Sequence, residues 1–255
     1  SDVYKRQHEQ GVRVLVLPEL CITGYTCQDL FFQQTLLDGA LNALKDITEH
    51  SAGLDMLIAV GCPLRFRGEL YNCAVVMKDG KILGVVPKKF LPNYNEFYEK
   101  RHFTAAPEGE YDIELFGESV PFGLGLLFEC RGTPELVFAA EICEDLWAAE
   151  PPSISLALGG ATLIANLSAS NETIGKDSYR RELVNSQSAR LLCGYVYASA
   201  GSGESTQDLV FGGHDIIAEN GIVLAESKLY STGLTVTEID VQKLCLLYTS
   251  PSPRD

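Results

Sequence analysis

The chain of 255 residues carries 34 Asp and Glu against 20 Lys and Arg, a formal net charge of −14, and 46% of its residues are hydrophobic. This apolar content is enough for a sizeable core and excludes a disordered chain. The negative charge argues against a partner with a phosphate backbone or an anionic lipid surface, and no apolar run reaches the roughly 18 residues of a membrane helix.

The two ends of the chain differ from everything between them. Residues 1–7 and 245–255 interrupt the apolar rhythm, and the second stretch becomes rich in Ser and Pro. We therefore expect a foreign leader at 1–7, a foreign tail at 245–255 and one domain over residues 8–244.

Between the ends, short β-rich runs alternate with helical stretches. A helix capped by Thr26, with Asp29 three residues later, is expected to run to about residue 52. Further helices are expected at 178–191 and from the Pro151-Pro152 pair onward. The predicted strands are 12–17, 55–61, 74–77, 82–86, 135–142, 161–167, 192–199, 210–218, 221–225 and 234–239.

Two dipeptides, Asp79-Gly80 and Asn220-Gly221, each separate a pair of these strands and predict tight hairpin turns. Hairpins placed among strands and helices favour mixed sheets over purely parallel ones. The overall prediction is an α/β fold in which helices cover the sheets.

The eight cysteines are scattered among apolar runs, with no Cys-x-x-Cys pair and no histidine at ligand spacing from a cysteine. This pattern argues against a disulfide scaffold and against a structural zinc site. It is typical of buried thiols in a reducing compartment. We therefore expect a cytoplasmic protein without a metal site.

Three predicted strands end on a potentially reactive residue. Glu19 follows the strand at 12–17, Lys88 the strand at 82–86, and Cys143 the strand at 135–142. Loops beyond strand ends form the ligand crevice of α/β folds. Each residue alone has a plainer interpretation, as a turn cap, a solvated lysine or one more buried thiol, but their common placement favours a shared site.

The chemistry of such a trio is amide or nitrile hydrolysis. A thiolate attacks the carbon, a carboxylate carries the proton, and an ammonium group stabilises the oxyanion. The acidic neighbours of Cys143 at positions 141, 144 and 145 are expected to raise its pKa. The thiol therefore needs a dedicated base and a cation, and Glu19 and Lys88 are the candidates.

Five segments of the chain resemble the nitrilase/carbon–nitrogen hydrolase superfamily, in the right order. Three of them are PELCITGY at 18–25, PKKFLPNYNEFYE at 87–99 and EICEDLW at 141–147. The lysine segment, together with ANLSAS at 165–170 and GESTQDL at 203–209, resembles more closely the glutaminase domain of glutamine-dependent NAD synthetases. The resemblance covers roughly residues 9 to 244.

The resemblance implies catalytic roles at the matching positions. Cys143 would be the nucleophile, Glu19 the proton acceptor and Lys88 the third catalytic residue. Glu96 falls where the superfamily often has a second glutamate that helps to position the substrate. The implied reaction is hydrolysis of the glutamine side-chain amide to glutamate and ammonia through a Cys thioester, with no cofactor.

The resemblance also places glutamine-binding residues at Tyr94, Phe97, Glu144, Ser170 and Lys176. By their chemistry, Glu144 suits an α-ammonium group and Lys176 suits a carboxylate. The plainer interpretation of Tyr94 and Phe97 is core packing, and that of Ser170 is a turn residue.

The implied fold is a four-layer α-β-β-α sandwich, in a protein that forms homo-oligomers. In the family a strand and a helix precede the strand matched at 12–17. A synthetase domain follows, uses ATP and Mg²⁺, and carries an S-G-G-x-D-S phosphate loop. This chain has no such loop, so we expect it to be truncated at both ends and to supply ammonia to a synthetase domain that it lacks.

Three other interpretations remain open. One is a Cys-His hydrolase that uses Cys143 with His102 or His214. Another is a different nitrilase-type amidase. The third is an inactive fragment that acts as a scaffold, against which the presence of all three catalytic residues argues.

Overall fold

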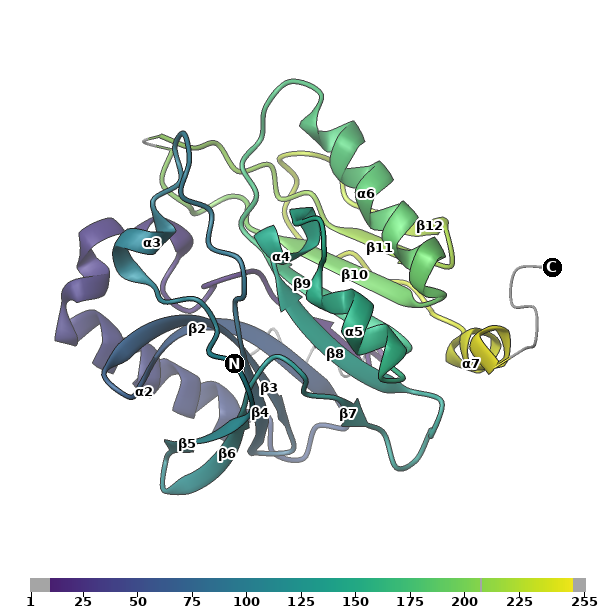
Figure 1. Cartoon of the computed structure of the whole chain (residues 1–255), viewed down its shortest axis with the longest axis horizontal. Helices are drawn as coiled ribbons and strands as arrows, with labels where there is room; N and C mark the ends of the chain where they lie inside the picture. The colour runs from purple at the N-terminus through teal and green to yellow at the C-terminus, as the bar shows by residue number, and fades with distance from the viewer. Residues whose placement is uncertain (1–9, 207, 250–255) are drawn as a thin grey trace.

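Two six-stranded sheets, packed face to face, form the centre of the chain (Figure 1). The computed structural model describes residues 10–206 and 208–249. The first sheet has the order β1-β2-β3-β4-β6-β5, with β1 Val14–Val16, β2 Leu57–Phe66, β3 Glu69–Lys78, β4 Lys81–Pro87, β5 Tyr111–Leu115 and β6 Glu118–Phe122. The second has the order β12-β11-β10-β9-β8-β7, with β7 Phe128–Glu129, β8 Val137–Ile142, β9 Leu163–Ser168, β10 Gly194–Ser199, β11 Ile216–Glu219 and β12 Ile222–Glu226.

Both sheets combine parallel and antiparallel pairs, as predicted. In the first sheet β1 and β2 run parallel, and β3 is antiparallel to both β2 and β4. In the second sheet β8, β9 and β10 run parallel, and β11 reverses. The carboxyl ends of β1 and β4 therefore lie at one edge of the first sheet, and those of β8 and β9 at one edge of the second.

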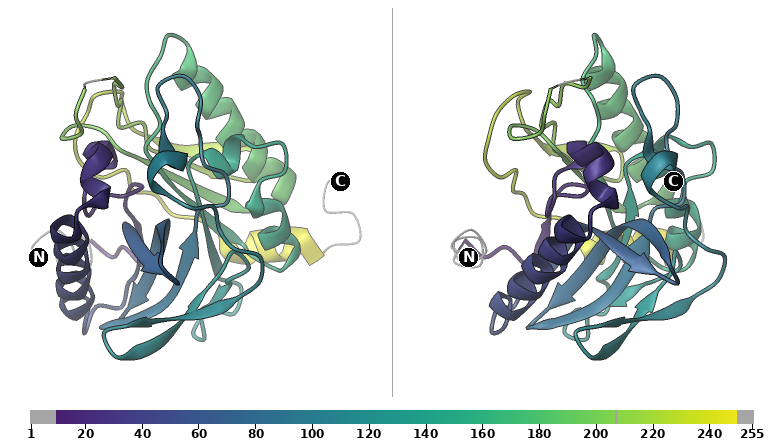
Figure 2. Two further views of the ribbon diagram at one scale, coloured as in Figure 1. Left: turned by 60° about the vertical axis from the view of Figure 1, so that its left-hand side comes forward. Right: turned by 90° about the vertical axis from the view of Figure 1, so that its left-hand side faces the viewer.

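Helices cover the outer face of each sheet (Figure 2). Helix α2 packs on the first sheet, and helices α5 and α6 pack on the second. The confirmed architecture is the four-layer α-β-β-α sandwich. The helices are the 3₁₀-helix η1 Tyr25–Phe32, α2 Gln34–His50, α3 Glu99–His102, α4 Glu144–Trp147, α5 Pro152–Leu158, α6 Lys176–Leu191 and α7 Val241–Thr249.

The central strands are apolar on both faces because each face meets a different layer. Along β2, Ile58 and Val60 pack in the cluster that includes α2, whereas Ala59 between them packs in the cluster between the sheets. Successive side chains of a strand point to opposite faces, so a strand buried on both sides reads as a continuous apolar run. Small side chains such as Ala140 and Ala165 let the two sheets approach.

The two predicted hairpins are confirmed. Asp79 and Gly80 have φ values of 49° and 75°, and Asn220 and Gly221 have 44° and 82°. Positive φ at both central residues is what a tight hairpin turn of this type requires. These turns connect β3 with β4 and β11 with β12.

The helix predicted from Thr26 to about residue 52 is divided. The 3₁₀-helix η1 comes first, Gln33 is extended with φ −91° and ψ 123°, and α2 begins only at Gln34. Thr26 caps no helix, because its Oγ1 donates to Glu204 Oε2 at 2.8 Å. A contact across the fold thus replaces the local cap.

Several strand predictions are wrong or incomplete. No strand forms at 234–239, and residues 231–239 instead line a cavity of about 790 Å³ together with β1. The strand at 210–218 is shorter than predicted and begins at Ile216. Strands β5, β6 and β7 were not predicted.

The predicted foreign tail at 245–255 overlaps the last helix. Helix α7 includes residues 245–249, and its Leu244 is fully buried. The predicted leader at 1–7 and residues 250–255 of the predicted tail lie outside the described residues. In the part of the chain that is described, no helix has the length and apolar character to cross a membrane.

Candidate active site

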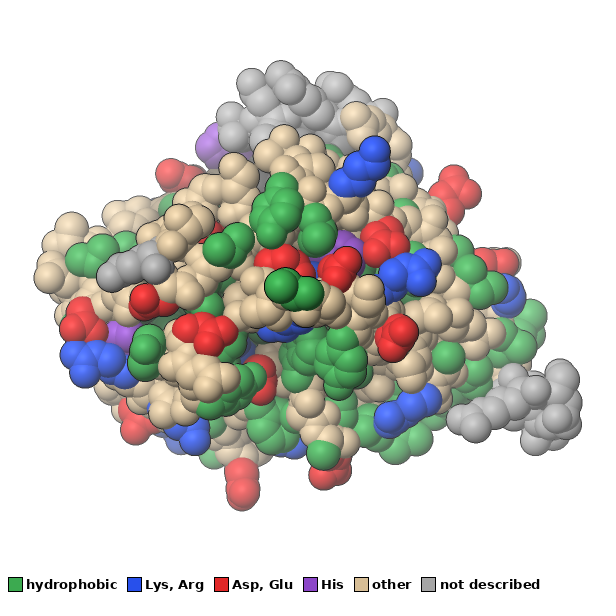
Figure 3. Space-filling model, turned by 90° about the horizontal axis from the view of Figure 1, so that it is seen from above, with side chains coloured by type: hydrophobic (Ala, Val, Ile, Leu, Met, Phe, Trp, Pro, Cys, Tyr) green, Lys and Arg blue, Asp and Glu red, His purple; other side chains and the backbone are tan. Residues whose placement is uncertain are grey.

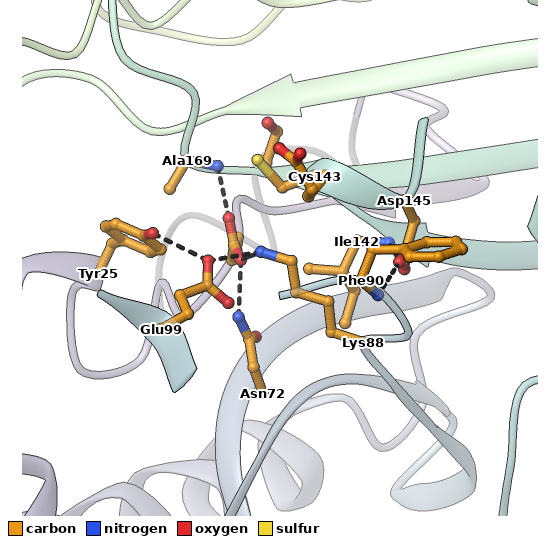
Figure 4. A network of polar contacts seen from close by, with 12 residues as sticks. Tyr25, Asn72, Lys88, Phe90, Glu99, Ile142, Cys143, Asp145 and Ala169 are labelled. Atoms are coloured by element: carbon orange, nitrogen blue, oxygen red, sulfur yellow. Dashed lines mark hydrogen bonds and ion pairs between the residues drawn. The ribbon is translucent and has the colours of Figure 1, made fainter. Parts of the chain in front are cut away.

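The three residues predicted from strand ends come together at one place, between the carboxyl ends of strands from both sheets (Figure 4). Glu19 follows β1, Lys88 directly follows β4, and Cys143 directly follows β8. Their exposed fractions are 0%, 1% and 6%. The site is therefore buried, which strengthens every electrostatic interaction inside it.

Lys88 lies between two carboxylates. Its Nζ donates to Glu19 Oε1 and to Glu99 Oε1, each at 2.6 Å. Glu19 has two further partners, since Asn72 Nδ2 donates to Oε1 at 2.6 Å and the backbone N–H of Ala169 donates to Oε2 at 2.9 Å. The last bond connects Glu19, which follows a strand of the first sheet, to the end of β9 in the second sheet.

Burial and charge act in opposite directions on Lys88. Burial alone would lower the pKa of its ammonium group, but the carboxylates of Glu19 and Glu99 outweigh burial and hold that pKa well above its usual value. Lys88 is therefore a permanent cation. Burial raises the pKa of Glu99 to about 7, against the opposing effect of Lys88, so this carboxyl group changes its protonation near neutral pH.

Cys143 sits on a constrained turn between β8 and α4. Its φ of 41° and ψ of −99° are unusual for a residue with a side chain, and such backbone costs on the order of 1–3 kcal/mol unless its surroundings hold it. Asn166 on β9 does so, because its Oδ1 accepts from the Cys143 N–H at 3.0 Å. The Leu167 carbonyl accepts from the same N–H at 3.0 Å.

The thiol itself is not acidic. Burial and then the Glu19 carboxylate raise the pKa of Cys143 to about 12, while the Lys88 ammonium and the Ser168 hydroxyl lower it. The predicted direction is correct, but burial and Glu19 dominate rather than the neighbours in sequence. At neutral pH the thiol is protonated, and it requires a base to become a nucleophile.

Asp145 holds the backbone around this site. Its side chain is fully buried and accepts from the backbone N–H groups of Phe90 at 2.8 Å, Lys89 at 3.1 Å and Ile142 at 3.0 Å. Burial and then the Glu141 carboxylate raise its pKa, whereas the N–H groups of Phe90 and Ile142 lower it and so favour the ionised carboxylate.

Two contacts link predicted glutamine-binding residues to one another, Tyr94 with Glu144 and Lys176 with Phe97. Tyr94 is half exposed, and its hydroxyl donates to both carboxylate oxygens of Glu144 at 3.0 Å. Lys176 Nζ lies 6.0 Å from the centre of the Phe97 ring. Burial lowers the pKa of Lys176 and raises that of Glu144, so a ligand that pairs with both groups would restore their charged forms.

Two of these side chains also have structural partners. Phe97 packs in a small cluster with Ala169, Leu209 and other apolar residues. The Ser170 hydroxyl accepts from the guanidinium of Arg180, at 3.4 Å. The Phe97 contacts agree with core packing, whereas the Ser170 contact does not test its interpretation as a turn residue, and both binding roles stay predictions.

The second glutamate at the lysine is Glu99 and not Glu96. Glu99 contacts Lys88 and accepts from the Tyr25 hydroxyl at 2.8 Å. Glu96 instead accepts from the side-chain amide of Asn171, whose oxygen accepts from Lys176. The role of Glu96 in positioning the substrate stays a prediction, and it would act through Asn171 and Lys176.

Sequence reasoning also missed supporting residues. Asn72 stands in an otherwise apolar strand, where a lone amide is a signal of a buried polar contact. Asn166 and Asp145 lie within the segments ANLSAS and EICEDLW, but nothing in the sequence shows that they hold the backbone turn at Cys143. The sequence signal that could have identified Glu99 as a partner of Lys88 is its position three residues after Glu96, which is about one helical turn.

Neither candidate histidine has Cys143 as a partner. The ring of His102 pairs with Asp29 at 3.0 Å. The ring of His214 contacts Arg180 and Glu226, at 2.9 and 2.7 Å. The Cys-His interpretation is thus contradicted. Across residues 10–206 and 208–249, no group of three or more His, Cys, Asp or Glu side chains could hold a metal ion.

Acidic and hydrophobic side chains are intermixed on the face seen from above in Figure 3. Ile174, in the loop before α6, is fully exposed, and Tyr98 and Tyr179 are about half exposed. The large cavity beside β1 is a separate feature, because none of the predicted catalytic or predicted glutamine-binding residues lines it.

Comparison with protein families gives a match to the model described as carbon-nitrogen hydrolase, over residues 2–246. The chain is 45% identical over 245 residues to a glutamine-dependent NAD(+) synthetase of Mycobacterium tuberculosis, covering 95% of this chain and 36% of that protein. A human protein of the same name is 31% identical over 271 residues, with 96% and 38% covered. The chain thus spans just over a third of the length of these relatives.

Solved structures agree on the fold. A glutamine-dependent NAD(+) synthetase from Cytophaga hutchinsonii superposes with a TM-score of 0.80 at 32% identity, over 90% of this chain and 37% of that chain. An amidase from Nesterenkonia sp. superposes with a TM-score of 0.70 at 20% identity, over 92% and 80% of the two chains. At that identity the second likeness concerns the fold alone.

Proposed function

Since the chain belongs to the carbon–nitrogen hydrolase family, we propose that it hydrolyses the side-chain amide of glutamine to glutamate and ammonia. The observation that carries this proposal is the buried Glu19–Lys88 pair beside a Cys143 thiol whose pKa is raised to about 12. Such a thiol is inert alone and becomes reactive only with a base and a cation at hand.

In the first half of the reaction Glu19 takes the proton from the Cys143 sulfur, and the thiolate attacks the amide carbon. The carbonyl oxygen becomes an oxyanion, and the Lys88 ammonium stabilises it. Glu19 then gives its proton to the amide nitrogen, the C–N bond breaks, and ammonia leaves. A thioester between Cys143 and the glutamyl group remains.

In the second half Glu19 takes a proton from a water molecule, and the resulting hydroxide attacks the thioester carbon. The C–S bond breaks, glutamate leaves, and the proton returns to the sulfur. Glu99 also accepts a hydrogen bond from Lys88 and so helps to keep the ammonium group in place through both halves. No cofactor takes part.

The amino-acid part of glutamine binds on the open side of the site. Glu144 pairs with the α-ammonium group, and Lys176 pairs with the α-carboxylate. Tyr94 orients Glu144 through its hydroxyl, and Phe97 and Ser170 border the remaining space.

The wider setting follows from the names of the relatives. The ammonia would serve NAD synthesis by a synthetase domain that uses ATP and Mg²⁺ and lies outside the present sequence. We also expect the protein to work as a homo-oligomer in the cytoplasm.

The decisive experiment compares two cysteine variants, both at buried positions. Cys143→Ala should abolish the formation of glutamate from glutamine, and Cys193→Ala, at a site remote from Lys88, should leave it within about threefold. Glutamate release is measured on the purified chain, with asparagine and acetamide as competing substrates. Undiminished activity of Cys143→Ala refutes the mechanism, and a preference for acetamide would indicate another amidase.

A further inference from the structure

Asp145 connects the two parts of the chain that carry Lys88 and Cys143. One carboxylate oxygen accepts from Phe90 and Lys89 N–H, directly after Lys88, at 2.8 and 3.1 Å. The other oxygen accepts from Ile142 N–H, directly before Cys143, at 3.0 Å. Figure 4 shows the carboxylate between the two backbone segments.

These two segments belong to different sheets. The Lys88 N–H bonds to the Asn72 carbonyl in the first sheet at 2.8 Å, and Cys143 is bonded to β9 in the second sheet. The layer between the sheets is apolar, and apolar packing does not fix a direction. Hydrogen bonds to a carboxylate are short and directional. Asp145 therefore fixes the position of the Lys88 backbone relative to the Cys143 backbone, which the apolar layer alone does not fix.

A second buried carboxylate near Cys143, that of Glu141 on strand β8, has different partners. Glu141 is 1% exposed and lies two residues before Cys143. Its oxygens accept from the Ser153 N–H in α5 at 2.8 Å and from the Tyr195 hydroxyl. Glu141 therefore binds within the second sheet and its covering helix, and it does not reach the Lys88 segment.

We infer that Asp145 is a positioning residue that sets the Lys88 ammonium group at its working distance from the Cys143 sulfur. It touches no reacting atom and acts through the two backbone segments it joins. This inference rests on the roles proposed for Lys88 and Cys143.

The informative variant is Asp145→Asn. An amide keeps one acceptor oxygen and presents N–H groups in place of the second acceptor. It can therefore accept from the Lys89 and Phe90 N–H groups or from the Ile142 N–H group, but not from both sides. A misplacement of about 1 Å can cost 10²-fold in rate. We expect kcat for glutamine to fall about 10²-fold while KM changes less than about threefold.

Glu141→Gln is the matched control, because it makes the same chemical change at an equally buried carboxylate on the other side of Cys143 in the sequence. It should leave kcat within about threefold. Circular dichroism and the thermal midpoint verify that both variants fold. If Asp145→Asn does not fold, Asp145→Glu, which keeps the charge but displaces the oxygens, should show the same split between kcat and KM.

Two results would overturn the inference. One is an equal loss of kcat in Asp145→Asn and Glu141→Gln. The other is a multiplicative loss when Asp145→Asn is combined with Lys88→Ala, because a residue that acts through Lys88 has nothing left to position in its absence.

The rate at which iodoacetamide alkylates Cys143 tests the position of Lys88 relative to the thiol without any substrate. This rate should fall about 10-fold or more in Asp145→Asn and stay within about threefold in Glu141→Gln. If the unaltered chain did not hydrolyse glutamine, the proposed function would fail, whereas the alkylation rates would still decide the role of Asp145.

Discussion

Replacing Glu99 by Gln is expected to stabilise the folded chain at pH 8 while slowing glutamine hydrolysis. Glu99 is buried, its Oε2 has no hydrogen-bond partner among the described residues, and its Oε1 accepts from Lys88 and Tyr25. Together with Glu19 and Lys88 it forms a cluster of two carboxylates and one cation. Glutamine has the shape of the protonated acid and removes the surplus negative charge.

The size of the effect follows from the pKa of Glu99, raised from 4.5 to about 7 in the folded chain. One pKa unit corresponds to about 1.4 kcal/mol, so at pH 8 the ionised carboxylate lowers the free energy of unfolding by about 3 kcal/mol relative to the neutral form. Because the folded pKa is the higher one, the stability contributed by the proton is complete below pH 4.5 and is lost as the pH rises through 7.

Urea unfolding of both proteins at pH 5 and pH 8 measures this. The stability advantage of Glu99→Gln should be roughly 2 kcal/mol larger at pH 8 than at pH 5, and kcat should fall at least about tenfold because Lys88 loses its second carboxylate. Glu96→Gln, which removes a carboxylate bonded to Asn171 and not to Lys88, is the control and should show no such gain. An advantage of Glu99→Gln that is the same at both pH values would refute the reasoning.

Further predictions concern the base, the cation and a close backbone contact. Glu19→Gln and Lys88→Ala should each lower kcat at least about 10²-fold. The loss in the double variant should be far smaller than the product of the two single losses. Multiplicative losses in the glutamate-release assay would show that the two residues act independently. Gly61→Ala should destabilise the chain by about 3 kcal/mol in urea unfolding, because an added Cβ would lie 2.1 Å from the backbone of residues 18–20. Gly39→Ala in helix α2, where an added Cβ meets nothing within 4 Å, should instead stabilise the chain by about 1 kcal/mol. Equal changes in unfolding free energy for the two variants would contradict the close contact at Gly61.

The meeting of Glu19, Lys88 and Cys143 could be predicted because each of the three follows a strand whose end the sequence marks. Continuous apolar runs before Glu19, Lys88 and Cys143 identify strands buried on both faces, and a polar residue directly after such a run lies at a sheet edge. The same logic predicted the hairpins, since Asp-Gly and Asn-Gly suit positive φ at both turn positions.

The residues that hold the trio in place could not be derived in this way. Glu96 and Glu99 are both acidic and one helical turn apart, and only the path of the chain through the short helix α3 decides which one meets Lys88. The roles of Asn72 and Asp145 depend on which strands become neighbours, and this information is not local. The strand predicted at 234–239 is wrong for a related reason. A strand-like pattern forms a strand only where a neighbouring strand can pair with its backbone groups.

The division of the site between two sheets has a consequence for the life of the chain. The proton acceptor and the cation arise from the first sheet and the thiol from the second, and Glu19 reaches the second sheet through the Ala169 N–H. A chain in the course of synthesis, or one whose sheets have separated, holds the components of the reaction but not the reaction centre. Its thiol then has neither Glu19 nor Lys88 beside it, so any reaction that needs all three groups can begin only once the two sheets are packed together and stops when they separate.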